Sequence, residues 1–257
     1  MKQIIFLLIT LSFFSCKNEN NSSKEEGIIL EWNFDKKLKY KYNYFRNTTI
    51  NFENTEIEQT RNANSFDEGK IILNSIGNSF ADLSLKNVNI VVGGDVGNDT
   101  MTDLIDSSFI RNINSNGAGF NSDSIGYEYK LLLQLPTKPI EIGEKEEFDF
   151  KIPFTWNGGI FYTKGTYTLT YLKNGKLNDT KCAILLGSLD VSNIEFEVEL
   201  MEAIEDGLEV EFSGEVKQYF DITNKCLLGA DIKLNSIFNS NKYNFMNTET
   251  IMSVRID

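Results

Sequence analysis

Alternation of apolar and polar residues with a period of two is the feature that most restricts the fold of this chain. The segment 38–44 alternates leucine or tyrosine with lysine or asparagine, and 166–171 alternates threonine with tyrosine or leucine. The segment 194–200 alternates apolar residues with glutamate. Successive side chains of a strand point to opposite faces of a sheet, so this pattern indicates strands with one buried face. We therefore predict an all-β fold of antiparallel strands, as a curved sheet, a sandwich or a half-open barrel with little helix.

The three prolines, all between residues 136 and 153, divide the chain. Proline lacks a backbone N–H and has a fixed φ, so this stretch is not a regular central strand. We predict an amino-terminal β half at 28–135 and a carboxy-terminal β half at 136–257. The apolar run 131–135 is expected to end a strand. The sequence leaves open whether the halves share one sheet or form two domains.

Net charge and the absence of histidine exclude several functions. The formal charge is −12 and the chain contains no histidine. Nucleic acid requires basic patches, so it is not an expected partner. Without histidine there is no Ser-His-Asp triad, Cys-His pair or histidine metal site. The hydrophobic fraction of 41% is that of a globular protein.

The first sixteen residues predict export. Lys2 is followed by a run at 4–14 that is apolar apart from Thr10 and Ser12. The run is shorter than the ~20 residues that span a bilayer, but it fits a signal peptide. Ser15-Cys16 after this run resembles the lipobox of bacterial lipoproteins, although Phe13 and Phe14 make the match relaxed. The alternative is a conventional signal peptidase site, in which Thr10 and Ser12 are the two small residues that precede the cleaved bond.

The lipobox resemblance implies a signal peptide at 1–15, an acylated Cys16 and a flexible polar tether at 16–27. Several acyl chains on Cys16 would hold the protein on a membrane, since two lipid signals suffice for stable anchoring. Lys17, rather than aspartate, follows the cysteine. By resemblance to known sorting rules this favours the outer membrane, and both a periplasmic and a cell-surface orientation stay open.

A second resemblance covers roughly residues 28–257. The turn Leu135-Pro136-Thr137-Lys138-Pro139-Ile140-Glu141-Ile142-Gly143, with the strands near 38–42 and 167–171, is similar to a pattern in Bacteroidota lipoproteins. That family often has a tryptophan shortly after the turn glycine, where this chain has Phe148. The family has no established activity, so the resemblance implies fold and location and transfers no catalytic residue.

The segment 93–126 is rich in Gly, Asn, Asp and Ser, and we expect a long irregular excursion with a short helix near 101–109. Asp95, Asp99 and Asp103 are candidate calcium ligands, because Ca²⁺ prefers oxygen ligands in such loops. Their spacing is not that of an EF-hand, and a solvated turn is the alternative. No other cofactor is expected.

Two tripeptides in this excursion resemble the Asp-Ser/Thr-apolar pattern used for O-glycosylation of exported Bacteroidota proteins. They are Asp99-Thr100-Met101 and Asp123-Ser124-Ile125, with Thr100 and Ser124 as the acceptors. Such a modification would affect surface and solubility rather than catalysis.

Two cysteines remain after Cys16. Cys182 and Cys226 are an even pair in an exported protein, which is the setting for a disulfide. The alternative is two unpaired buried thiols that act as small apolar residues. The sequence leaves both interpretations open, because it gives no Cα separation.

We expect a lipid-anchored, non-enzymatic binding or interaction module whose partner is an envelope protein or a glycan. One alternative is a carrier of a lipid or other apolar ligand, in an open cavity lined by Tyr40, Tyr42, Tyr44, Phe148, Phe150 and Trp156. The other is a carboxylate-dependent glycan hydrolase that uses two of Glu195, Glu197, Glu199, Glu209 and Glu211. These glutamates alternate with apolar residues, as on a solvated sheet face, whereas a catalytic acid needs burial to raise its pKa.

Overall fold

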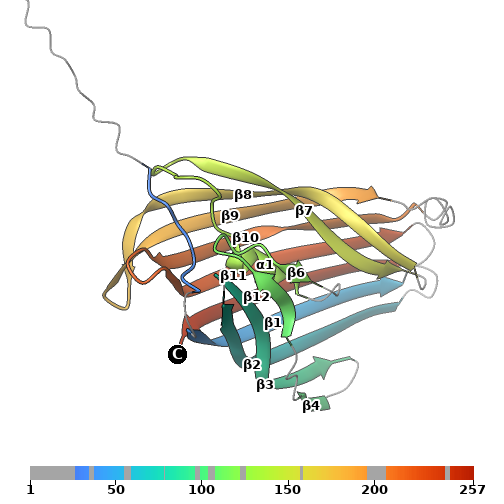
Figure 1. Ribbon diagram of the computed structural model, residues 1–257. Helices are drawn as coiled ribbons and strands as arrows, with labels where there is room; N and C mark the ends of the chain where they lie inside the picture. Colours follow the sequence, from blue (N-terminus) through green and yellow to red (C-terminus); the bar gives the residue numbers. More distant parts are fainter. Residues whose placement is uncertain are drawn as a thin grey trace, which may run out of the picture.

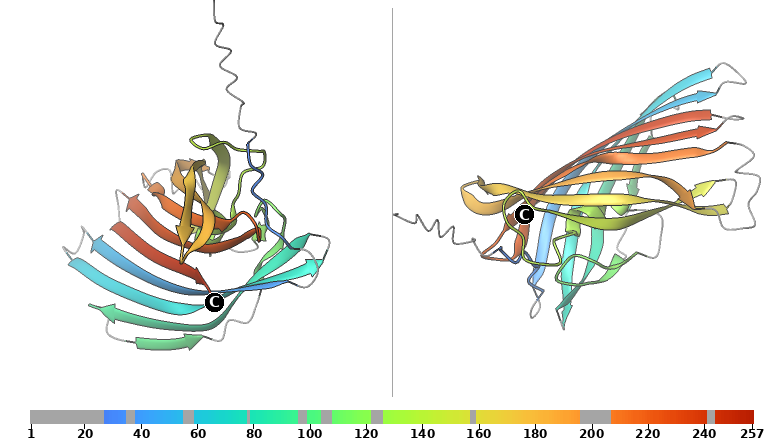
Figure 2. Two further views of the ribbon diagram at one scale, coloured as in Figure 1. Left: turned by 90° about the vertical axis from the view of Figure 1, so that its left-hand side faces the viewer. Right: turned by 90° about the horizontal axis from the view of Figure 1, so that it is seen from above.

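The structure is a computed structural model, and it describes residues 27–34, 38–54, 59–77, 79–95, 99–103, 108–121, 126–156, 159–195, 207–240 and 244–257. Within these ranges twelve antiparallel strands form one sheet, and a single short helix lies inside its curve (Figures 1 and 2). The sheet runs from an edge at β6 to an edge at β7 and does not close. The predicted all-β class is confirmed, in the form of a curved open sheet.

The strand order is β6-β5-β3-β2-β1-β12-β11-β10-β9-β8-β7, and β4 also pairs with β3. The elements are β1 (Lys39–Asn54), β2 (Gln59–Gly77), β3 (Phe80–Gly94), β4 (Asp99–Asp103), β5 (Ser108–Ile113), β6 (Phe120–Asn121), α1 (Tyr127–Leu133), β7 (Lys145–Trp156), β8 (Gly159–Leu177), β9 (Thr180–Glu195), β10 (Glu209–Asp221), β11 (Cys226–Ser240) and β12 (Asn244–Ile256).

The first and last long strands join the two halves of the chain. β1 pairs with β12 from Tyr42 opposite Ile256 to Glu53 opposite Phe245. Strands of 28–135 and of 136–257 therefore belong to one continuous sheet. The strand that contains Pro153, β7, lies at the edge of this sheet, where a residue without an N–H does not interrupt a ladder.

The period-two pattern places the apolar face of the strands on the concave side. Tyr42 and Tyr44 of β1 are each 1% exposed, whereas Lys39 and Lys41 are exposed. Tyr167 of β8 is likewise fully buried. The tyrosines therefore form core packing rather than an open platform. Burial raises the pKa of Tyr44 to about 12, the two carboxylates Asp67 and Glu128 also raising it and Arg46 lowering it.

One end of the concave face is covered by segments that are distant in sequence. Ile28 exchanges backbone hydrogen bonds of 3.0 Å with Ile140, and the Trp32 N–H donates to the Ser115 carbonyl at 2.7 Å. The Trp32 indole Nε1 donates to the Leu133 carbonyl of α1 at 2.9 Å. These contacts join the segment 27–34 to α1 and to the connections at 115 and 140, and the Asn33 N–H donates to the Lys225 carbonyl next to β11 at 2.9 Å (Figure 1).

The apolar run that the sequence analysis assigns to a strand is a helix in the structure. Residues 127–133 form α1, and its leucines are buried. Gln218 of β10 donates from Nε2 to the carbonyls of Leu131 at 2.9 Å and Leu132 at 3.0 Å. The last carbonyls of a helix have no partner within it, so this buried amide attaches α1 to the sheet. Short apolar runs do not distinguish a buried strand from a helix.

One further local prediction is corrected. The excursion 93–126 contains β4, β5 and β6, so Met101 and Phe109 lie in strands rather than in a helix. Asn-Gly is also a common hairpin turn, yet at Asn174-Gly175 β8 continues to Leu177 and the chain turns at Asn178 and Asp179. Both turn residues have positive φ, which Asn and Asp tolerate.

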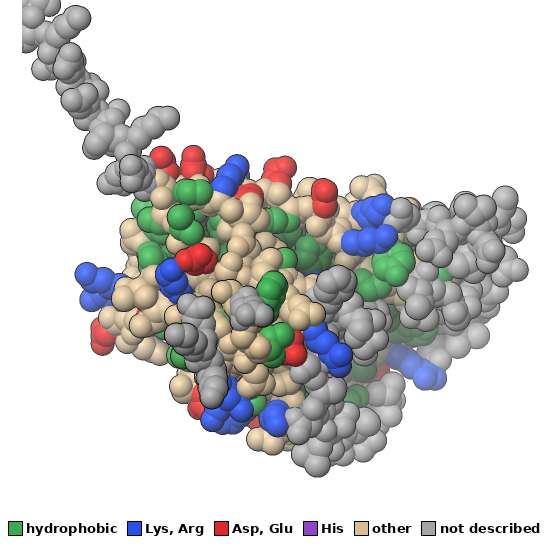
Figure 3. Space-filling model, viewed as in Figure 1, with side chains coloured by type: hydrophobic (Ala, Val, Ile, Leu, Met, Phe, Trp, Pro, Cys, Tyr) green, Lys and Arg blue, Asp and Glu red, His purple; other side chains and the backbone are tan. Residues whose placement is uncertain are grey.

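The surface is mixed in character. In the space-filling view, acidic and basic side chains are interspersed with apolar ones (Figure 3). Among the described residues, no helix has the length and apolar content needed to cross a membrane.

Candidate functional site

A groove with a volume of about 490 Å³ lies on the concave face beside the start of α1. This volume is within the range of ~300–1,000 Å³ that is typical of small-molecule sites. Six strands and the helix contribute to it, and strands β1 and β7, which are distant in the sheet order, provide facing walls. The lining residues are Arg46, Thr48, Ile50, Ser65, Gly126, Tyr127, Glu128, Ile152, Pro153, Phe154, Phe212, Leu234, Ser236, Phe238, Thr248 and Thr250.

One wall of the groove is aromatic. Phe238 of β11 contacts Phe212 of β10 and Phe154 of β7 edge-on, with ring centroids 5.7 and 5.9 Å apart. Tyr127 of α1 contacts Phe212 at 5.4 Å. Edge-to-face aromatic pairs at such distances are favourable and hold the rings in place. Ile152 and Pro153 extend this wall along β7.

The other wall carries hydroxyl groups. Thr48 of β1 is paired with Thr250 of β12 and with Ser65 of β2, and the hydroxyls of Thr48 and Thr250 lie 3.2 Å apart. Thr248 of β12 is paired with Ser236 of β11. Thr48 lies on the same face of β1 as Tyr42 and Tyr44, because it follows each of them by an even number of positions. The concave face of β1 therefore carries core tyrosines at Tyr42 and Tyr44 and a groove-lining hydroxyl at Thr48.

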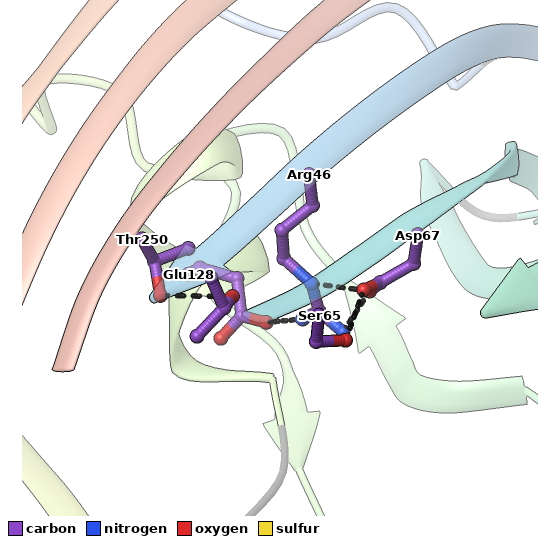
Figure 4. A network of polar contacts seen from close by, with 6 residues as sticks. Arg46, Ser65, Asp67, Glu128 and Thr250 are labelled. Carbon is purple, nitrogen blue, oxygen red and sulfur yellow. Dashed lines mark hydrogen bonds and ion pairs between the residues drawn. The ribbon is translucent and has the colours of Figure 1, made fainter. Parts of the chain in front are cut away.

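Arg46 lies at the inner end of the hydroxyl wall and joins three elements (Figure 4). Its Nε donates to Oδ2 of Asp67 on β2 at 2.5 Å, and its Nη2 also contacts that oxygen. Its Nη1 donates to Oε1 of Glu128 on α1 at 2.7 Å. Ser65 donates to the second oxygen of Asp67 at 3.1 Å. The side chains of Asp67 and Glu128 are 1% and 9% exposed, so this network is largely withdrawn from water.

The charges of the network act on one another. Burial disfavours the Arg46 cation, but the nearby Glu128, Tyr129 and Asp67 raise its pKa above the ordinary value. Arg46 is therefore a permanent cation with both carboxylates as partners. Burial raises the pKa of Tyr127 in the groove lining, and the Glu128 carboxylate raises it further while Arg46 opposes this. The phenol consequently stays neutral at physiological pH.

The candidate calcium ligands lie at the end of β3 and on β4. Asp95 follows β3, is exposed and accepts a hydrogen bond from the Asn62 N–H at 2.9 Å through Oδ2. Asp99 and Asp103 are the ends of β4, four residues apart in a strand, which separates them by ~13 Å along its axis. The described part of the chain holds no group of three acidic or cysteine side chains that could bind a metal.

The modification sites are placed only in part. Thr100 lies in β4. Ser124, the signal peptide at 1–15 and Cys16 with almost all of its tether lie outside the described residues. The acylation and glycosylation of these residues stay predictions.

Cys182 and Cys226 are free, buried thiols in the structure. β10 lies between them, since Asp221 pairs with Cys226 while Phe220 pairs with Ala183, the neighbour of Cys182. Two strand spacings are about 9–10 Å, which exceeds the ~7 Å limit for the Cα atoms of a disulfide. The two thiols also belong to separate apolar clusters. The structure thus has the unpaired arrangement, and burial, followed by the nearby Asp221 carboxylate, raises the pKa of Cys226 to about 11.

The glutamates proposed for a hydrolase are not gathered in the groove. Glu209 and Glu211 are exposed and lie on the face of β10 opposite Val210 and Phe212. Glu195 ends β9, and Glu197 and Glu199 are outside the described ranges.

Of the aromatic residues expected to line a carrier cavity, the five whose side chains the structure describes do not line the groove. Tyr42 and Tyr44 are core residues, and Tyr40, Phe148 and Phe150 pack against the same core. The side chain of Trp156 is not described, and Trp32 is buried at 3% exposure. Three residues of the groove, Arg46, Phe154 and Phe238, were not predicted from the sequence. Continuing the period of two from Tyr44 would have placed Arg46, Thr48 and Ile50 on the concave face.

No family model and no curated protein matches the chain. Among solved structures, it is similar to lipovitellin, in a structure concerned with lipid–protein interactions, with 13% identity and a TM-score of 0.47. That match covers 85% of this chain and only 25% of the lipovitellin chain. A DUF1329 family protein from Desulfovibrio piger matches with 10% identity and a TM-score of 0.17, covering 84% of this chain and 85% of the other.

Proposed function

We propose that this protein is a non-enzymatic binding protein that carries an amphiphilic small molecule in the groove of its concave face. The observation that carries the proposal is the combination of two kinds of surface in one groove: phenylalanine rings on β7, β10 and β11 line it together with hydroxyl side chains on β1 and β12. Pockets of mostly apolar lining with a few placed polar groups are typical of small-molecule sites. A molecule with an apolar chain and a polar head group matches both walls.

The groove favours a carrier over a module that binds a glycan. Sugar-binding platforms present aromatic rings to solvent, whereas Trp32, Tyr42 and Tyr44 are buried in the core. An apolar chain would instead contact the parts of Phe154, Phe212 and Phe238 that line the groove and displace water from them.

Filling the groove should weaken binding. Ser236 lies in the groove lining, and S236W would place a large ring between the two walls. We expect the affinity for the neutral fluorescent probe N-phenyl-1-naphthylamine to fall by about tenfold or more. Native mass spectrometry of the purified domain should likewise show co-purified amphiphile in the parent and less in the variant.

The matched control is S213W, because Ser213 is an exposed residue on the opposite face of β10. It adds the same ring to the sheet outside the groove and should bind the probe like the parent. Thermal unfolding identifies variants that fail to fold, and T248F gives a second, smaller obstruction. Unchanged probe affinity in folded S236W and T248F would contradict the groove as the binding site.

We also propose that Cys16 anchors this carrier in the outer membrane, which would place the groove beside a source of amphiphiles. The lipobox-like sequence supports this. Cells that express C16S should show no incorporation of labelled palmitate into the protein, which should then fractionate with soluble material. Persistent labelling of C16S would show that the anchor is elsewhere.

A further inference from the structure

The inner end of the groove has an excess of one negative charge. Arg46 contributes one positive charge, whereas Asp67 and Glu128 contribute two negative charges. Each of the three guanidinium nitrogens of Arg46 already has a carboxylate partner. An arginine in a lipid-binding groove would ordinarily bind an acidic head group, but here its single charge is outnumbered by the two carboxylates that it already contacts.

An anionic head group would therefore meet an unfavourable environment. To take over an ion pair of Arg46 it would have to displace Asp67 or Glu128, leaving a buried carboxylate without its partner. If it stayed beside the intact network, it would lose hydration next to an excess negative charge. The Tyr127 hydroxyl, whose pKa is raised by burial and by Glu128, stays neutral and adds no charge to the groove lining.

The hydroxyl wall suits a different head group. Ser65, Thr48, Thr250, Thr248 and Ser236 lie on three pairs of neighbouring strands and line the groove next to this network. A serine or threonine hydroxyl both donates and accepts, so the row can hydrogen-bond to another hydroxyl without any ion pairing. Apolar chain contacts remain available beside this row at Phe212 and Phe238.

We infer that the groove selects uncharged, hydroxyl-bearing, single-chain amphiphiles of the monoacylglycerol type, and discriminates against anionic amphiphiles such as ionised fatty acids. The inference rests on the proposed carrier function and names the ligand class of the same groove. Arg46 acts in it as a positioning residue that holds Asp67 and Glu128, rather than as a ligand of the head group.

Displacement of N-phenyl-1-naphthylamine from the full chain at pH 8 tests this. The competitors are 1-monolaurin and laurate, which have the same twelve-carbon chain and are used below their critical micelle concentrations. We expect laurate to bind about tenfold or more weakly than 1-monolaurin. Laurate binding equal to or tighter than that of 1-monolaurin would overturn the inference and leave the carrier function intact. Binding of neither competitor, with S236W indistinguishable from the parent, would overturn both.

Charge variants test whether the network of Arg46, Asp67 and Glu128 causes the preference for 1-monolaurin over laurate. E128Q removes the excess negative charge, so the preference for 1-monolaurin over laurate should shrink to about threefold or less. D67N makes the same change from the sheet side and serves if E128Q fails to fold. E211Q is the matched control, because Glu211 is exposed on the opposite face of β10 and its loss should leave the preference unchanged. An unchanged preference in folded E128Q or D67N would contradict the role of the network.

Discussion

R46M should lower the free energy of unfolding by about 3–5 kcal/mol, the cost of leaving buried charges without their partner. Arg46 is the cation between Asp67 on β2 and Glu128 on α1, and both carboxylates are nearly inaccessible to water. Methionine retains much of the apolar stem but none of the donors. Two buried carboxylates would then have lost their common partner. Urea unfolding followed by circular dichroism measures the change.

The loss should be recovered in part by neutralising the partners. The triple variant R46M/D67N/E128Q removes all three charges and should be more stable than R46M, since the penalty comes from unpaired charge rather than from the missing attraction. K233M is the control: Lys233 pairs with Glu249 at 2.9 Å, and both side chains are well exposed. Its unfolding transition should be nearly that of the parent. A similar small effect for R46M would show that the network is open to water in solution.

W32A should lower the free energy of unfolding by about 3–5 kcal/mol, the usual cost of truncating a large buried aromatic residue. Trp32 stacks on Phe34 with ring centroids 5.7 Å apart and meets Phe220 of β10 edge-on at 5.5 Å. Its indole N–H is also the donor to the Leu133 carbonyl of α1. The substitution therefore leaves a cavity and removes the link between the segment 27–34 and the helix. Thermal and urea unfolding report the loss.

W32F separates the two contributions, because phenylalanine keeps an aromatic ring and lacks the N–H. It should cost less than W32A, and about 1–3 kcal/mol of its effect is expected from the unsatisfied Leu133 carbonyl. I29A is the control on the same segment: Ile29 is 63% exposed, and its truncation should change stability by no more than about 0.5 kcal/mol. Equal stability of W32A and I29A would show that this segment does not cover the core.

The face of a strand on which a side chain lies was predictable, because it depends only on alternation along the chain. Tyr42, Tyr44 and Tyr167 share one face with their apolar neighbours whatever their pairing partners are, since side chains alternate along any strand. Pro153 was likewise limited to an edge or an irregular position by its missing donor. The helix α1 was not predictable from its apolar run, because burial on several sides gives the same composition in a helix and in a central strand.

Whether the two cysteines can form a disulfide is decided by the order of the strands in the sheet. Cys182 and Cys226 are equally compatible with a disulfide and with two thiols until the strand order is known. The insertion of β10 between their strands separates them. No property of either residue encodes that insertion.

The sequence by itself determined the all-β class, the face of each side chain in the alternating strands, and the chemistries that a chain without histidine cannot perform. Only the tertiary structure decided the groove and its charge. Arg46 meets Glu128, which is 82 positions away, because α1 folds into the curve of the sheet. Phe154 and Phe238 come together because the sheet bends until its β7 edge faces β1. Such contacts depend on long-range pairing and curvature, which are set by the packing of the whole sheet rather than by any local pattern of residues.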